Sequence, residues 1–146
     1  MKTLGVMRYG GTNALELVEL PEPHAKTGEV RVKVMSAGIN TVDVMVRDGS
    51  PDAMFQAFSP PYVPGMDPAG IIDEIGDADA SSLQGLRLGD AVLGVVDNVG
   101  SYGAYSEYVC LPIASVALKP SIRHALSRGR IVPYERSYRP QCFGRA

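Results

Sequence analysis

The sequence predicts a mainly β fold, built as a small barrel or sandwich. Residues 29–35 (EVRVKVM) alternate charged and apolar side chains over a full strand length, which is typical of a half-buried strand. Many short strands separated by glycine-rich turns favour such an architecture over a helical one. Apolar runs of strand length predict further strands at residues 3–7, 15–19, 69–75, 91–96 and 103–111.

Helix signals are few in this chain. The best lies at residues 41–47, where Asn40 or Thr41 can serve as the N-cap. Asp43 then falls in the first turn, where its negative charge suits the helix dipole. Leu88-Gly89-Asp90 predicts a turn between two strands.

Composition fits a soluble globular domain. The chain has 146 residues, of which 45% are hydrophobic and 21% charged, and no apolar run approaches the ~20 residues needed to span a bilayer. The first residues lack the long apolar region of a secretory signal. Two cysteines, Cys110 and Cys142, exclude a disulfide framework and a four-cysteine zinc lobe. We therefore expect a cytoplasmic location and no membrane partner.

Charge divides the chain into two compositions that meet near Pro120. Residues 1–119 hold 8 basic and 15 acidic side chains, whereas residues 120–146 hold 6 arginines and a single acidic residue, Glu135. We expect a folded domain over residues 1–120 and an irregular or disordered basic tail over residues 121–146. Arginine clusters can bind nucleic acid, but this scattered set predicts no nucleic-acid partner.

Residues 62–76 (YVPGMDPAGIIDEIG) form the most informative stretch of the sequence. Gly65 and Gly70 can adopt backbone angles that other residues avoid, and they allow a close approach. Pro64 and Pro68 fix their own φ angles and so stiffen the turn. A rigid turn entering an apolar strand is suited either to the wall of a cleft or to a purely structural role before a buried strand.

Four motifs in order resemble the N-terminal, GroES-like half of a medium-chain dehydrogenase/reductase, and within it the zinc-independent quinone oxidoreductase group. They lie at residues 28–49, 62–76, 86–96 and 100–120. The resemblance implies a partly open β-barrel with a few short helices. It also implies hydride transfer from NADPH to a small-molecule acceptor, a quinone or an enone, in which the cofactor carries the chemistry.

The resemblance also makes a prediction about metal. Zinc alcohol dehydrogenases of this superfamily carry a cysteine where this chain has Gly38, and a His-Glu pair where it has Met66-Asp67. A catalytic zinc needs about three protein ligands. Gly38 and Met66 cannot supply them, and Asp67 alone cannot hold the ion, so we expect no metal.

The same resemblance nominates site residues. Asn40 and Asp43 are the candidate catalytic residues, and Asn40 and Met45 the candidate cofactor contacts. Asn40 is equally suited to an N-cap, and Asp43 to a structural role in the first helical turn or in a pair with Arg47. Some quinone reductases carry a tyrosine at the position of Met45, so this pocket should be more apolar.

Three further residues complete the nominated cleft. Met66 and Asp67 are expected to line its floor, and Tyr102 its rim. Tyr105 is a second rim candidate, although its alternating context is more typical of a core residue.

In the related enzymes a Rossmann domain follows the segment that corresponds to residues 116–120. Here no GxGxxG run follows a strand, so most of the NADPH site is expected to be missing and the isolated chain to be inactive. We interpret residues 121–146 as a frameshifted or truncated end, or alternatively as a genuine short tail. Three readings of function remain: an oxidoreductase half, an inactive remnant, and a small interaction module. Exposed apolar surface would favour self-association.

Overall fold

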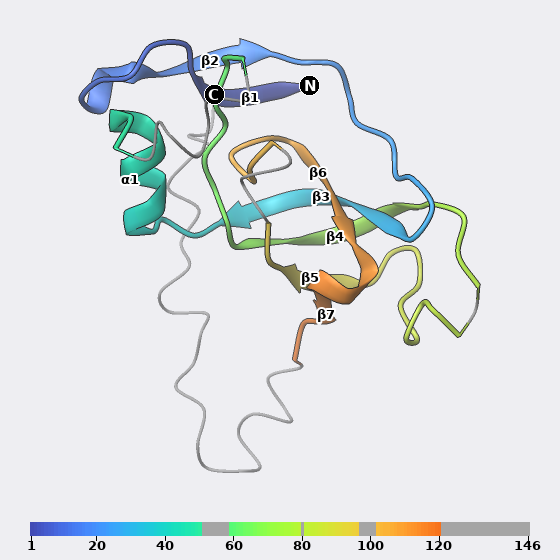
Figure 1. Ribbon diagram of the computed structural model, residues 1–146. Coiled ribbons are helices and arrows are strands. Elements are labelled where there is room, and N and C mark those ends of the chain that lie inside the picture. Colours follow the sequence, from blue (N-terminus) through green and yellow to red (C-terminus); the bar gives the residue numbers. More distant parts are fainter. Residues whose placement is uncertain (51–58, 80, 97–101, 121–146) are drawn as a thin grey trace, which may run out of the picture.

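The computed structural model describes residues 1–50, 59–79, 81–96 and 102–120. Within them the chain forms two antiparallel sheets, one α-helix (α1, Thr41–Asp48) and two short 3-10 turns (Figure 1). The strands are β1 Lys2–Val6, β2 Leu15–Glu19, β3 Glu29–Ala37, β4 Pro68–Ile75, β5 Ala91–Gly94, β6 Tyr108–Pro112 and β7 Val116–Leu118; the turns are η1 Thr12–Ala14 and η2 Ile113–Ser115. The prediction of a mainly β fold with little helix is confirmed.

The larger sheet has the strand order β6-β3-β4-β5-β7, and β1 and β2 pair separately. All pairings between these strands are antiparallel. In the described residues β6 and β7 are the two edges of the larger sheet, so the sheet curves without closing, as expected for a partly open barrel. No helix in the described part of the chain is long and apolar enough to cross a membrane.

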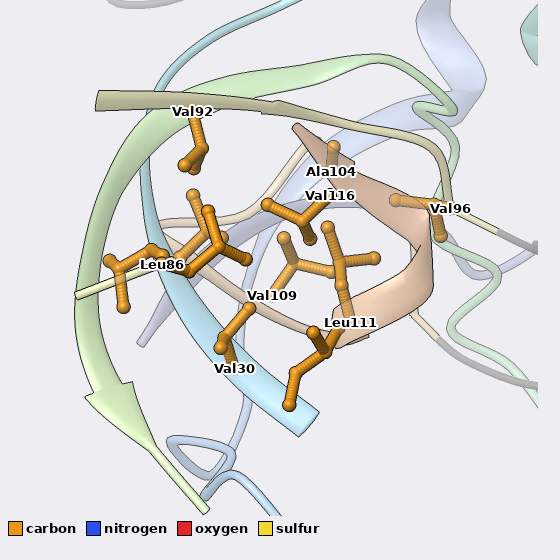
Figure 2. Close-up of a cluster of buried hydrophobic side chains, with 11 residues drawn as sticks. Val30, Leu86, Val92, Val96, Ala104, Val109, Leu111 and Val116 are labelled. Atoms are coloured by element: carbon orange, nitrogen blue, oxygen red, sulfur yellow. The ribbon is translucent and has the colours of Figure 1, made fainter. Parts of the chain in front are cut away.

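The hydrophobic core fills the concave side of the larger sheet. Figure 2 shows valine and leucine side chains from β3, β5, β6 and β7 pointing toward one another. The alternation predicted for residues 29–35 is visible in β3, where Val30 and Val32 are buried and the intervening Arg31 faces outward to Asp73. Burial of this cluster is the main driving force for folding.

The two sheets are joined by backbone contacts outside their regular strands. Leu4 donates to the carbonyl of Tyr105 over 2.7 Å, and Val6 exchanges two hydrogen bonds with Tyr62. These hydrogen bonds connect strand β1 to the segments around Tyr62 and Tyr105.

One strand starts later than predicted. The apolar run at residues 103–111 forms β6 only from Tyr108 onward. Gly103, Ala104 and Tyr105 instead donate their N–H groups to the carbonyls of residues 63, 65 and 64, so their backbone is bonded to a loop rather than to a neighbouring strand. The predictions for residues 121–146 lie outside the described residues.

Candidate functional site

The centre of the candidate site is a hydrogen bond between Asn40 and Asp67. The antiparallel pairing of β3 and β4 aligns Ala37 with Pro68, which places the residues after β3 opposite the residues before β4. The Nδ2 of Asn40 donates to Oδ2 of Asp67 over 2.5 Å, and the N–H of Gly38 donates to the carbonyl of Asp67 over 3.1 Å. Both side chains are half-buried, so the pair is accessible from solvent.

Asn40 is the N-cap of α1, as predicted, while its side-chain amide reaches Asp67. The two sequence interpretations of this residue are therefore compatible. Only one of the two N–H bonds of the amide is used on Asp67. The second remains a donor for an oxygen atom of a ligand.

Asp43 is buried beneath this pair, with only 4% of its surface exposed. Its Oδ2 accepts a hydrogen bond from the backbone N–H of Asn40 over 2.7 Å, and its Oδ1 accepts one from the N–H of Gly65, also over 2.7 Å. The hydroxyl of Tyr105 lies 3.3 Å from Oδ2. Asp43 thus takes the first-turn position that was predicted. The alternative pairing with Arg47 is not among the ion pairs of the described residues.

Gly65 allows the close contact on which this arrangement depends. Its φ of +103° is a conformation that residues with a side chain rarely adopt. A Cβ at this position would lie 2.7 Å from Cδ1 of Tyr105 and 2.8 Å from the backbone nitrogen atoms of Ala104 and Tyr105. The predicted close approach is therefore real at Gly65. Gly70 has no positive φ, but it also lacks room for a side chain, since a Cβ there would lie 2.1 Å from the carbonyl oxygen of Lys33.

The other nominated residues, Met45, Met66 and Tyr102, are more exposed than Asp43. Met45 on α1 is 38% exposed and Tyr102 is 46% exposed. Met66 is half-buried, and its carbonyl accepts a hydrogen bond from Val96. The structure therefore joins Asn40, Asp43 and Asp67 in one network, with Met66 adjacent along the chain, whereas the hydrogen bonds of this network do not include Met45 or Tyr102.

Tyr105 is the residue whose part in the network sequence reasoning missed. It is 6% exposed, as a core residue would be, but its hydroxyl is shared between Asp43 and the carbonyl of Gly38. The alternation of apolar residues gives no sign of these contacts. The one available signal was the polar end of a tyrosine expected to be buried, which needs a partner.

The described residues contain no group of three or more histidine, cysteine or acidic side chains placed to hold a metal ion. Cys110 is a poor nucleophile, because burial, together with the neighbouring Glu29 and Glu74, raises the pKa of its thiol to about 11.

Comparison with known proteins identifies the family. The model of the alcohol dehydrogenase GroES-like domain matches residues 26–121. The human synaptic vesicle membrane protein VAT-1 homolog-like is 34% identical over 116 residues, which cover 80% of this chain and 25% of that protein. The chloroplastic NADPH-dependent alkenal/one oxidoreductase of Arabidopsis thaliana is 32% identical over 128 residues, which cover 82% of this chain and 31% of that protein.

Among solved structures, the quinone oxidoreductase from Coxiella burnetii superposes with a TM-score of 0.73 at 27% identity, covering 83% of this chain and 37% of that one. The chain thus belongs to the alcohol dehydrogenase GroES-like family of the medium-chain dehydrogenase/reductase superfamily, which confirms the predicted family. It spans 25% to 37% of the length of these three proteins.

Replacement of Gly65 by alanine tests the close packing at the site. Gly85 provides the matched control, since its φ is +84° but no atom lies within 4 Å of the position of its Cβ. Gly85→Ala should cost about 1–2 kcal/mol of unfolding free energy from the left-handed backbone alone. Gly65→Ala should cost roughly a further 1–3 kcal/mol because it also overpacks. Urea unfolding of both variants measures the difference, and equal losses would contradict the packing described here.

Proposed function

We propose that this chain carries the acceptor-binding half of an NADPH-dependent, zinc-independent oxidoreductase that reduces a quinone or an enone by hydride transfer. The observation that carries the proposal is the accessible Asn40–Asp67 pair, supported from below by buried Asp43. The names of the Arabidopsis and Coxiella relatives support the two acceptor classes, and the name of the former supports NADPH.

In this proposal the bound nicotinamide would supply the hydride, and the protein would orient the reacting groups. Asn40 would donate its remaining side-chain N–H to an oxygen atom, either of the acceptor carbonyl or of the nicotinamide ribose. Asp43 would fix Asn40 through the backbone. The half-exposed apolar side chains of Met45, Met66 and Tyr102 would surround the acceptor and exclude water.

Independence from zinc rests on donor atoms. The positions that correspond to zinc ligands in the related alcohol dehydrogenases are Gly38, which has no side chain, and Met66, whose thioether is a poor ligand for zinc. Asp67 uses Oδ2 on the Asn40 amide. Polarisation of an acceptor carbonyl would then come from the Asn40 N–H, and the reaction would require an acceptor that is already activated. A cytoplasmic enzyme is consistent with the free thiol of Cys110.

The alternative is a chain without activity of its own, either a remnant of such an enzyme or a small β module that binds a partner. This alternative is supported by coverage, because the chain spans only 25% to 37% of the length of the three relatives, and the activity of a whole protein need not belong to a part of it. The two readings make opposite predictions for the same titration.

The test is a titration of the purified chain with NADPH, followed by nicotinamide fluorescence and by oxidation in the presence of tetramethyl-1,4-benzoquinone. An active chain should show saturable binding and turnover. In that case Asn40→Ala should lower kcat/KM about 5- to 150-fold, as expected for the loss of a hydrogen bond worth ~1–3 kcal/mol. Asn13→Ala, at an exposed position in η1, is the matched control and should leave kcat/KM unchanged.

Two results would limit the proposal. Absence of both binding and turnover would match the inactivity expected from the sequence for the isolated chain and would support the inactive alternative, with the family unchanged. Turnover that is equal in the Asn40 and Asn13 variants would instead retain the enzyme and reject the role of Asn40.

We also propose that the chain self-associates through exposed apolar side chains. More than half of the surface is exposed at Leu17, Met35, Ile39, Leu88, Val95 and Leu118. Light scattering should show a mass above that of the monomer that increases with protein concentration, and a dye that binds apolar surface should fluoresce. A monomer at every concentration, without dye binding, would reject the proposal.

A further inference from the structure

Tyr105 contacts two segments that lie far from it in the sequence, residues 38–43 and Pro64. Its hydroxyl is 3.3 Å from Oδ2 of Asp43 in the first turn of α1 and 3.3 Å from the carbonyl oxygen of Gly38 at the end of β3. Its backbone N–H donates to the carbonyl of Pro64 over 3.0 Å. Tyr105 therefore contacts both segments that carry the Asn40–Asp67 pair.

The tyrosine ring is held firmly enough to position its hydroxyl. The side chain is 6% exposed, and the face of Gly65 that lacks a Cβ lies against its ring. The carbonyl of Tyr105 accepts a hydrogen bond from Leu4 over 2.7 Å, which ties the same residue to the other sheet. The backbone of Tyr105 is therefore hydrogen-bonded and its ring buried, with the hydroxyl 3.3 Å from both Gly38 and Asp43.

The peptide of Gly38 has a hydrogen-bond contact on both sides. Its N–H donates to the carbonyl of Asp67, and its carbonyl oxygen lies 3.3 Å from the hydroxyl of Tyr105, whose single proton it shares with Asp43. Asn40 follows two residues later, and its backbone N–H donates to the same Asp43 oxygen that Tyr105 contacts. The Tyr105 hydroxyl, which does not belong to the pair, is thus linked to Asn40 through Asp43 and through the Gly38 peptide.

We propose that Tyr105 is a positioning residue for this site: its hydroxyl holds the Gly38 peptide and the Asp43 carboxylate so that Asn40 presents its amide to a ligand. The proposal rests on the proposed function for the identity of that ligand. Tyr105 acts through Asp43 and Gly38. It lies beneath the pair, so its removal should change how well a bound acceptor is oriented more than how tightly it is held.

The test compares Tyr105→Phe with Tyr108→Phe in the full chain labelled with ¹⁵N. Both substitutions remove only a hydroxyl. Tyr108 lies on another part of the sheet, where Cζ of Arg31 is 4.9 Å from the centre of its ring. Without any ligand, Tyr105→Phe should shift the side-chain amide resonances of Asn40 and speed their exchange about tenfold. Tyr108→Phe should leave these resonances in place. Unchanged Asn40 resonances in a folded Tyr105→Phe chain would overturn the proposal.

A kinetic readout separates this proposal from the proposed function. If the chain turns over tetramethyl-1,4-benzoquinone with NADPH, Tyr105→Phe should lower kcat about tenfold and leave KM within about twofold. A rise in KM with unchanged kcat would contradict positioning. If no variant turns over, the chain is inactive on its own, and the Asn40 resonances still decide the role of Tyr105.

Should Tyr105→Phe fail to fold, the wild-type chain provides the answer. The proposal requires that the hydroxyl proton of Tyr105 exchange with water much more slowly than that of the exposed Tyr102. Equal exchange of the two hydroxyl protons would overturn it.

Discussion

The buried carboxylate of Asp43 is the interaction on which the candidate site depends. It accepts hydrogen bonds from the backbone of Asn40 and of Gly65, with Tyr105 as a third, more distant donor. Asp43 is only 4% exposed, and a carboxylate on so buried a residue would be costly without such partners. Charge-assisted hydrogen bonds and the positive end of the α1 dipole offset that cost.

This interaction explains why the surrounding backbone is so tightly constrained. The N–H of Gly65 reaches Asp43 where residues 63–65 and 103–105 lie against each other, joined by three backbone hydrogen bonds. At Gly103 a Cβ would lie 2.1 Å from the carbonyl oxygen of Pro64, so that position, like Gly65, has no room for a side chain. Both glycines therefore allow the close approach of these two segments.

The local elements and part of the candidate site could be predicted from the sequence. Strand β3 followed from the alternation at residues 29–35, and α1 from its N-cap and its first-turn acid, because these signals lie within a few residues of the element that they predict. Asn40 and Asp67 were nominated separately. Their hydrogen bond depends on the register between β3 and β4, which is interrupted by irregularities at Arg31/Val32 and Val34/Ser36. No local pattern specifies that register.

The contacts of Tyr105 were beyond prediction for a related reason. They join residues separated by 62 and 67 positions, and the run of apolar residues around Tyr105 predicted a strand where the backbone bonds to a loop instead. Long-range pairing overrode local propensity here, as it commonly does for short strands.

The most direct measurement is hydrogen exchange at the backbone amide of Gly65. This amide should be protected nearly as well as amides in the core strands, because its proton is held by a buried carboxylate at an N–O distance of 2.7 Å. The exposed amide of Gly85 is the internal reference for fast exchange. If Gly65 exchanged as fast as Gly85, the Asp43 carboxylate would not hold the two sides of the site together, and the account would be wrong.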